Sequence, residues 1–308
     1  MNNNFNTPVL FLVFNRLDTT KRVFERIRKV APPKLYIASD GHRDNREGEE
    51  EKVKTVREYV LNSIDWKCEV KTLFREKNLG CGKAVSQAIT WFFENEEMGI
   101  ILEDDCLPSA SFFPYCQELL YKYKSNSQIY HITGHNPLTY TEIPNSYYFV
   151  RIPHVWGWAT WRRAWKQYNF DIIDLDNFIK QRKINDVFNK GADRYYFIDV
   201  FKRIEKHDID TWDYQWTYTT FYNKGISINP AKNLITNIGF GPDATHTISD
   251  DPKHNNQQSF EVEEFMHPSE IKIDTHIIST INKRAFGINW LWYYKMRVKK
   301  IIRAFVPC

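Results

Sequence analysis

Strand-length segments alternate with helical patterns through the first hundred residues of the chain, and this alternation constrains the fold more than any other feature. The strand patterns lie at Val9 to Phe14, Lys34 to Ser39, Cys68 to Phe74 and Gly99 to Leu102, and the helical patterns between them lie at 18–30, 49–61 and 83–93. Strands joined by helical crossovers form a parallel sheet that is covered on both faces. We therefore expect an α/β fold with a mostly parallel sheet flanked by helices, whose ligands gather at the carboxyl ends of the strands.

The pattern changes after about residue 125, where shorter apolar runs and tryptophan-rich stretches replace the regular crossovers. No Pro/Gly/Ser-rich linker separates the two parts, so we expect one domain made of a first half, 1–125, and a second half, 126–260. The polar segment 239–259 predicts a mobile loop of the kind that closes over a ligand. Residues 261–308 form an extension.

Composition excludes several classes of protein. The chain has 42 Lys and Arg against 38 Asp and Glu, which argues against a nucleic-acid-binding protein, and 42% apolar residues argue against disorder. Its 5 cysteines form no CxxC pair, so neither a disulfide framework nor a zinc cage is indicated. Since no signal peptide and no membrane-spanning segment is apparent, we expect a cytoplasmic protein, peripheral on the inner membrane face at most.

Residues 281–308 contain Lys and Arg but no Asp or Glu. Their apolar residues fall at helical spacing, which predicts a basic amphipathic helix over 284–305. Such a helix fits peripheral contact with a membrane, because its cations meet anionic headgroups while its apolar face enters the acyl boundary. A terminal helix that docks on the core explains the same pattern, and both interpretations stay open.

Three consecutive acids, Glu103, Asp104 and Asp105, come directly after the strand pattern GIIL. Carboxylates this close repel one another, and a divalent metal with oxygen ligands offsets that repulsion. An acidic loop that faces solvent is the alternative interpretation. The place of the triplet at the carboxyl end of a strand favours the metal site.

Two further charged residues follow strand patterns, Arg16 after the first and Asp40 after the second. The ends of parallel strands converge on one crevice, which would bring together an arginine for phosphate and a carboxylate for a base or a ribose hydroxyl. The chain has neither GxxxxGK[ST] nor GxGxxG, which argues against a P-loop NTPase and against a dinucleotide-binding protein. Taken singly, each residue also fits a cap or a surface charge.

The motif Trp212-Asp213-Tyr214 opens a helical pattern that runs to Tyr222. Asp213 fits a helix cap, and it equally fits a general base, because apolar neighbours raise the proton affinity of a carboxylate. Trp212 would then wall the site.

Trp156, Gly157 and Trp158 belong to a second tryptophan-rich stretch. Tryptophan faces stack on sugars and glycine lets backbone approach a ligand, although core packing explains the same residues. His246 could bind a metal through its imidazole, although a lone loop histidine usually does not.

These motifs occur in the order FLVFNR, YIASDGH, NLGCGKAVSQAI, GIILEDDCLPSASFF, WGWATW, WDYQW and a Gly/His loop. The order resembles that of the GT-A nucleotide-sugar glycosyltransferases, which have a Rossmann-like sheet. Within them it is most similar to N-acetylglucosaminyltransferase I and to related bacterial transferases that decorate surface polysaccharides. The resemblance covers Pro8 to about Thr247 and implies that residues 1–125 bind the nucleotide sugar and 126–260 the acceptor.

The resemblance also implies roles for single residues. The family's acidic triplet matches Glu103, Asp104 and Asp105, of which Asp105 would hold Mn²⁺ (or Mg²⁺) and Asp104 would touch the ribose or metal-bound water. Arg16 would lie near the diphosphate and Asp40 at the nucleobase.

The family's catalytic base matches Asp213, and Tyr214 stands where its WDD-type motif has a second acid. Trp156, Trp158 and Trp212 would contact the sugar or the acceptor, with Gly157 between them.

The activity that the resemblance implies is transfer of a hexosyl or N-acetylhexosaminyl group, with inversion, from a nucleotide diphosphate sugar such as a UDP-sugar. The acceptor would be a hydroxyl of a glycan or a lipid-linked glycan in cell-surface polysaccharide synthesis. One alternative is a sugar nucleotidyltransferase, whose first loop usually contains glycine, whereas here the loop reads Asn15-Arg16-Leu17-Asp18. The other is a non-catalytic carbohydrate-binding protein, which explains the tryptophans but not the acids.

Overall fold

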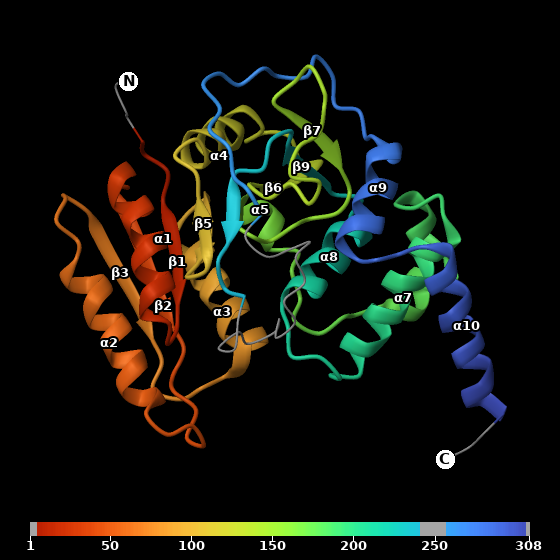
Figure 1. Ribbon diagram of the computed structural model, residues 1–308, viewed down its shortest axis with the longest axis horizontal. Coiled ribbons are helices and arrows are strands. Elements are labelled where there is room, and N and C mark those ends of the chain that lie inside the picture. The colour runs from red at the N-terminus through yellow and green to blue at the C-terminus, as the bar shows by residue number, and fades with distance from the viewer. Residues whose placement is uncertain (1–4, 241–256, 306–308) are drawn as a thin grey trace.

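The computed structural model describes residues 5–240 and 257–305, and it shows an α/β fold around one central, mostly parallel sheet (Figure 1). The eight strands stand in the order β3-β2-β1-β4-β8-β6-β9-β7. Their bounds are β1 Val9–Val13, β2 Lys34–Ser39, β3 Glu69–Phe74, β4 Met98–Glu103, β6 Ile129–Thr133, β7 Tyr147–Val150, β8 Trp158–Trp161 and β9 Ile226–Pro230.

The first four strands are parallel and are joined by α1 (Leu17–Val30), α2 (Glu49–Asn62) and α3 (Gly80–Asn95). The chain moves outward from β1 to β2 and β3, and then returns to place β4 on the other side of β1. The crossovers on the two sides of this point run in opposite directions, which opens a crevice at the carboxyl ends of β1 and β4.

The sheet continues from the first half into the second without a break. Strand β8 lies antiparallel between β4 and β6, with Ile100 opposite Ala159. A small second sheet pairs β5 (Cys106–Pro108) with β10 (Ile235–Asn237), also antiparallel, and it sets a segment of the second half directly beside the acidic triplet.

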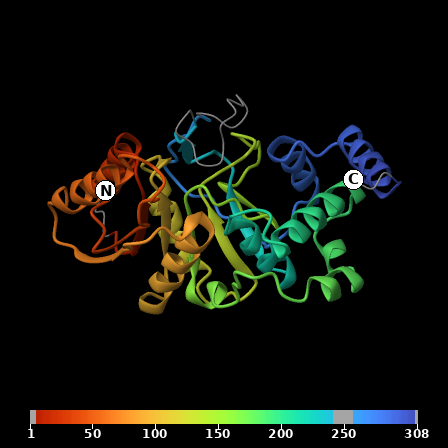
Figure 2. The same cartoon turned by 90° about the horizontal axis from the view of Figure 1, so that it is seen from below.

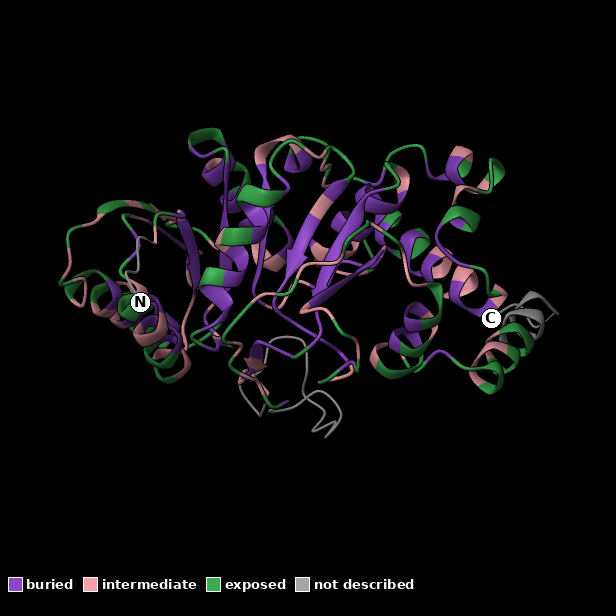
Figure 3. Cartoon of the chain, turned by 90° about the horizontal axis from the view of Figure 1, so that it is seen from above, coloured by how far each residue is buried: buried purple, intermediate pink, exposed green. Residues whose placement is uncertain are grey.

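Alternate residues of each strand feed two cores on opposite faces of the sheet, because side chains alternate along a strand. In β1, Val9 and Phe11 pack with α1, α2 and α4 (Phe112–Lys122), whereas Leu10 and Leu12 face α3. Seven of these eight strands are almost wholly buried, as the purple ribbons in Figure 3 show, whereas β3 at the sheet edge has no buried residue.

A third core lies beyond the strand β7 edge, among helices of the second half. These are α6 (Leu175–Lys180), the 3₁₀ turn Lys183–Asp186, α7 (Gly191–Glu205), α8 (Asp213–Tyr222), α9 (Thr275–Ala285) and α10 (Trp290–Phe305). A short helix, α5 (Arg162–Trp165), follows β8 on the α3 side of the sheet. Figure 2 shows the N-terminal part of the chain and this helical cluster at opposite ends of the molecule, with the middle of the sheet between them.

The basic segment is not the single helix that its spacing predicts. Gly287, with φ +64°, separates α9 from α10, and Ile288 just after it is buried in the third core. Glycine adopts the left-handed backbone conformation more readily than other residues do. A residue in this conformation ends one helix and changes the direction in which the next begins. None of the helices in the described parts of the chain is long and apolar enough to cross a membrane.

Candidate active site

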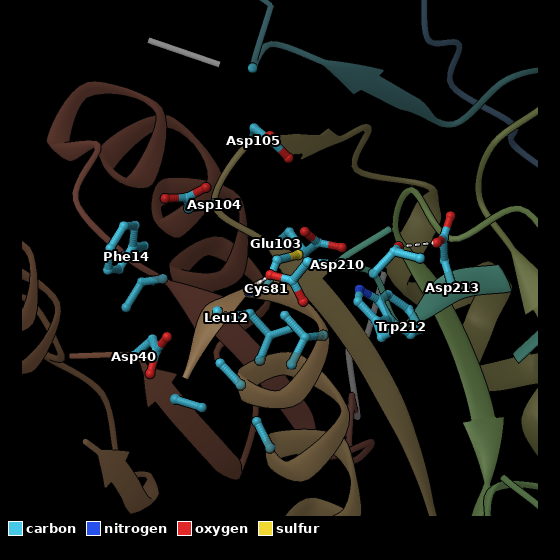
Figure 4. A pocket seen from close by; sticks show the side chains of 18 of the residues that line it. Leu12, Phe14, Asp40, Cys81, Glu103, Asp104, Asp105, Asp210, Trp212 and Asp213 are labelled. Carbon is cyan, nitrogen blue, oxygen red and sulfur yellow. Dashed lines mark hydrogen bonds between the residues drawn. The ribbon is translucent and has the colours of Figure 1, made fainter. Parts of the chain in front are cut away.

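A cavity of about 680 Å³ opens at the crevice between β1 and β4 (Figure 4). Both halves of the chain line it. Of the residues singled out from the sequence, it is lined by Arg16, Asp40, Glu103, Asp104, Asp105, Trp156, Trp212 and Asp213. The volume falls within the range of small-molecule sites.

The first wall of the cavity, which we call the carboxylate wall, consists of Arg16, Glu103, Asp104 and Asp105. Arg16 immediately follows β1, and the three acids follow the neighbouring strand β4, so the parallel pairing itself brings them together. The Arg16 guanidinium donates through Nη2 to Asp104 Oδ1 and, at 2.9 Å, to Asp105 Oδ2. One cation is thus shared between two of three adjacent carboxylates.

The carboxylate wall carries more negative charge than Arg16 neutralises. Burial, together with the charges of Asp105 and Asp104, raises the pKa of Glu103 to about 8. Burial also raises the pKa of Asp104 to about 6, against the opposing effect of Arg16. The raised pKa values show that negative charge on these carboxyl groups is unfavourable. A further cation beside them would therefore be stabilised.

A divalent ion fits this donor set in chemistry, because hard carboxylate oxygens are the ligands that Mg²⁺ and Mn²⁺ prefer. Within the described ranges, no three His, Cys, Asp or Glu side chains are arranged so that they could hold a metal ion by themselves. An ion at Asp105 would therefore take further ligands from substrate phosphates and water, as Mg²⁺ commonly does. His246, the other predicted ligand, lies outside the described residues.

Asp40 lies on the far side of the cavity, at the end of β2, and it contacts the start of α3. Its carboxylate accepts the backbone N–H of Leu79, with Oδ2 at 2.9 Å. Burial raises the pKa of Asp40, although this hydrogen bond opposes the shift.

A second carboxylate, Asp210, reaches the same helix end from the other half of the chain. Asp210 accepts the backbone N–H groups of Cys81 at 3.1 Å and Gly82 at 2.9 Å. A Cβ atom at Gly80 or Gly82 would lie 2.7 Å from an Asp210 oxygen, so glycine is required for this approach. Asp40 and Asp210 together satisfy backbone donors that would otherwise be unpaired at the helix start.

The opposite wall, which we call the aromatic wall, consists of Trp156, Trp212, Asp213 and Tyr214. Figure 4 shows Asp213 at the opposite side of the view from Asp40, with Glu103 and Asp210 between them. Asp213 is the first residue of α8, and its Oδ1 accepts the Thr211 hydroxyl and, at 2.9 Å, the backbone N–H of Tyr214. The Asp213 charge contributes to the raised pKa of Glu103, after the larger effects of burial and the neighbouring acids.

The N-cap position of α8 is Trp212, with no side-chain capping bond, so Asp213 does not serve as the cap. The Tyr214 hydroxyl, which stands where the resembled motif has an acid, lies 3.0 Å from the Tyr196 hydroxyl of α7. Asp213 is therefore the acid that this motif contributes to the cavity.

Trp158 and Gly157 do not line the cavity. Trp158 is 0% exposed and stacks on His131 and on Trp212, which corrects the expectation that it contacts a sugar. Gly157, at φ +57°, leaves room for the Ile235 side chain, so its lack of a Cβ serves packing. The Trp158 ring supports Trp212 from behind, and Trp212 itself lines the cavity while being only 3% exposed.

Asp210 is the site residue that sequence reasoning missed. Its neighbours Cys81 and Gly82 lie 129 and 128 residues away, so no local pattern joins them. The signal in the sequence was the pair of glycines, Gly80 and Gly82, at the start of a helix, where helix propensity disfavours them.

Arg57 also acts at this edge of the sheet without lining the cavity. Its Nη2 donates to the backbone carbonyls of Asp40 and Arg75, each at 2.8 Å, and its Nε donates to Ser39 Oγ at 2.9 Å. These bonds hold the ends of β2 and β3 together, and they fix the direction in which Asp40 leaves its strand.

Comparison with known proteins finds distant structural similarities at low sequence identity. No family model and no curated protein matches the chain. Among solved structures, the inositol-1-phosphate CTP transferase from T. maritima is 13% identical, with 81% of this chain and 94% of that chain covered, at a TM-score of 0.39. TarS residues 1–349 from S. aureus is 11% identical, with 75% and 59% covered, at 0.40.

The glycosyltransferase GlyE of Streptococcus pneumoniae TIGR4 is 10% identical, with 72% of this chain and 45% of that chain covered, at a TM-score of 0.34. Similarities at these identities and TM-scores do not assign an activity to this chain.

Proposed function

We propose that this chain is a metal-dependent, inverting glycosyltransferase. It would move a hexosyl or N-acetylhexosaminyl group from a UDP-sugar to a hydroxyl of a glycan or glycolipid in surface polysaccharide synthesis. The observation that carries the proposal is one cavity in which a carboxylate wall with an arginine faces Asp213 on an aromatic wall. Diphosphate binding needs the first set of groups and deprotonation of an alcohol needs the second.

Arg16 is suited to the diphosphate. Both of its ion pairs use Nη2, and Nη1 and Nε are further donors on the same planar group. A divalent ion at Asp105, with Asp104 acting through water, would offset the charge that builds on the departing diphosphate.

Asp213 is suited to be the base. The acceptor oxygen attacks the anomeric carbon, its proton passes to the Asp213 carboxylate, and the bond between that carbon and the diphosphate oxygen breaks with its electron pair. A single displacement of this kind inverts the anomeric centre. The hydrogen bonds from Thr211 and Tyr214 to Oδ1 hold the carboxylate in one orientation for this step.

The aromatic wall supplies the sugar-binding surface. Trp156, which is half-buried, lines the same cavity as Asp213, and an indole face binds the C–H face of a sugar while it excludes water. Trp212 is 3% exposed and forms the packed support of this surface. Water exclusion matters because water at the same place would hydrolyse the donor.

The test combines binding and turnover. Purified protein with Mn²⁺ is screened by thermal shift against UDP-, GDP-, dTDP- and CMP-sugars, and nucleotide release is followed for wild type, Asp105→Asn and Asp213→Asn. We expect metal-dependent stabilisation by a UDP-sugar, its loss in Asp105→Asn, and binding without release in Asp213→Asn. Asp176→Asn, at an exposed position on α6 whose neighbours in sequence do not line the cavity, is the matched control.

Two results would assign the site differently. Release of pyrophosphate from a nucleoside triphosphate and a sugar 1-phosphate would make the chain a sugar nucleotidyltransferase. Binding of oligosaccharides together with no response to any sugar nucleotide and any divalent ion would make it a carbohydrate-binding protein.

A further inference from the structure

Helix α10 carries a row of exposed apolar side chains. Trp290, Leu291, Tyr294 and Val298 are 57%, 84%, 60% and 53% exposed. At about 100° per residue, these four positions fall within roughly one third of the helix circumference. We call them the α10 face, and they form a contiguous patch of the kind that marks an interaction surface.

The opposite side of α10 is held against α7, so the direction of the α10 face is fixed. The Trp292 ring lies 5.6 Å from the ring of Tyr196, and the Tyr293 ring lies 5.5 Å from that of Tyr195. The α10 face therefore points away from the body of the molecule, at the end where Figure 1 shows α10 as the outermost helix. In Figure 3 the same helix is mostly green where it is coloured.

The charge of this region has one sign. From Thr275 to the last residue there is no Asp or Glu, whereas Lys283, Arg284, Lys295, Arg297, Lys299, Lys300 and Arg303 are basic. Lys295 and Arg297 are exposed and, at 100° per residue, lie on the two flanks of the α10 face. The sequence repeats apolar residues seven positions on, with Ile301 after Tyr294 and Phe305 after Val298.

We propose that the α10 face binds the surface of an anionic phospholipid membrane, lying in the plane of the interface. Tryptophan, tyrosine and leucine on one face enter the boundary between headgroups and acyl chains, and flanking cations meet the lipid phosphates. A protein groove would accept the apolar side chains as well, but the absence of any acid over this sequence favours a uniformly anionic partner. The proposal does not depend on the donor site.

The experiment is vesicle co-sedimentation of the full chain, without donor or metal. We expect binding to mixed phosphatidylcholine and phosphatidylglycerol vesicles, much weaker binding to pure phosphatidylcholine, and weakening by salt. The double variant Leu291→Glu/Val298→Glu should lower the partition coefficient at least about tenfold, since two charges replace two inserting side chains. Ile173→Glu/Met266→Glu, at residues that are 58% and 56% exposed elsewhere, should bind as wild type does.

A second pair of variants separates charge from insertion. Lys295→Gln/Arg297→Gln should reduce the preference for anionic vesicles, whereas Lys52→Gln/Lys54→Gln on α2 should not, although both positions are exposed.

Equal binding by wild type and Leu291→Glu/Val298→Glu would overturn the proposal, as would no binding to anionic vesicles. Sedimentation velocity gives the other decisive result. A dimer that dissociates in Leu291→Glu/Val298→Glu, with no vesicle binding by either protein, would show that the face joins two copies of the chain.

Discussion

The two walls of the cavity are built by different means. The carboxylate wall is set by backbone pairing, because Arg16 and the acidic triplet follow adjacent parallel strands in fixed register. The aromatic wall is set by side-chain packing, because Trp212 stacks on Trp158, which in turn stacks on His131. The carboxylate wall contains unbalanced negative charge, whereas the aromatic wall depends on buried aromatic rings. Different substitutions and pH changes should therefore disrupt the two walls.

The largest effect should come from Arg16→Gln, which removes the cation from the carboxylate wall. Asp104 would be left buried beside other carboxylates, and breaking such a pair destabilises by about 3–5 kcal/mol. The measurement is the free energy of unfolding by urea, with and without Mn²⁺, and we expect the ion to restore part of the loss.

Arg28→Gln is the matched control for Arg16→Gln. Arg28 also pairs with an aspartate, Asp65, but both side chains are largely exposed, so the change should be small. Equal losses in the two variants would mean that Arg16 has no special place in the wall.

The aromatic wall should weaken in acid. Burial lowers the pKa of His131 to about 3, below its ordinary value of 6.5. Between these two pH values, His131 binds a proton in the unfolded chain but not in the folded chain. The contribution of neutral His131 to the free energy of unfolding is therefore complete above pH 6.5 and is lost as pH falls towards 3. The loss is about 1.4 kcal/mol per pH unit in that interval.

The pH dependence can be assigned to His131 by NMR of labelled histidine. The His131 signal should stay that of a neutral ring down to the onset of unfolding, with exposed His276 as an internal reference. A His131 signal that titrates near pH 6.5 in the folded protein would contradict this account.

Gly239→Ala should disturb the carboxylate wall without removing a charge. A Cβ at this position would collide with the Asp105 carboxylate, which β10 brings beside it. A displacement near 1 Å of a positioned group costs up to about 100-fold in rate. We expect the rate of glycosyl transfer to fall roughly 10- to 100-fold, with little change in melting temperature. Gly191→Ala, whose nearest neighbour would lie 3.8 Å away, should leave the rate unchanged.

The smallest effect should come from Thr211→Val, which removes one hydrogen bond to Asp213. Loss of a bond that favours the carboxylate should raise the pKa of the base and reduce kcat by about 3- to 10-fold, since a hydrogen bond contributes about 1 kcal/mol. The pH profile of kcat should move its acid limb upward. Thr55→Val on α2 removes a comparable hydroxyl bond, to the Glu51 carbonyl, and should change neither quantity.

The local elements of the fold could be predicted from the sequence because their signals are local. The strand at Lys34–Ser39 has the predicted bounds, and the helix that begins at the WDY motif ends at Tyr222 as predicted. The antiparallel insertion of β8 could not be predicted, because its partner β4 lies some 60 residues earlier in the chain. Neither strand carries a sequence signal that specifies the other as its partner.

The residues of the candidate site also differ in whether the sequence could predict their positions. Residues that end a strand, such as Arg16, Asp40 and Asp105, could be placed at one cavity because parallel topology converges strand ends. The burial of Trp158 and the reach of Asp210 depend on packing between distant segments, which a single sequence does not encode visibly.

The contact between Asp210 and the start of α3 also bears on the order in which the chain folds during synthesis. Residues 80–82 leave the ribosome long before residue 210 does. Until then, the leading N–H groups of α3 have only Asp40, Asn78 and water as hydrogen-bond acceptors. Contacts of such sequence separation close late and slow the final step of folding. The first half, released alone, should therefore exchange the amide hydrogens of Cys81 and Gly82 rapidly, and completion of the cavity and completion of the fold should be the same event.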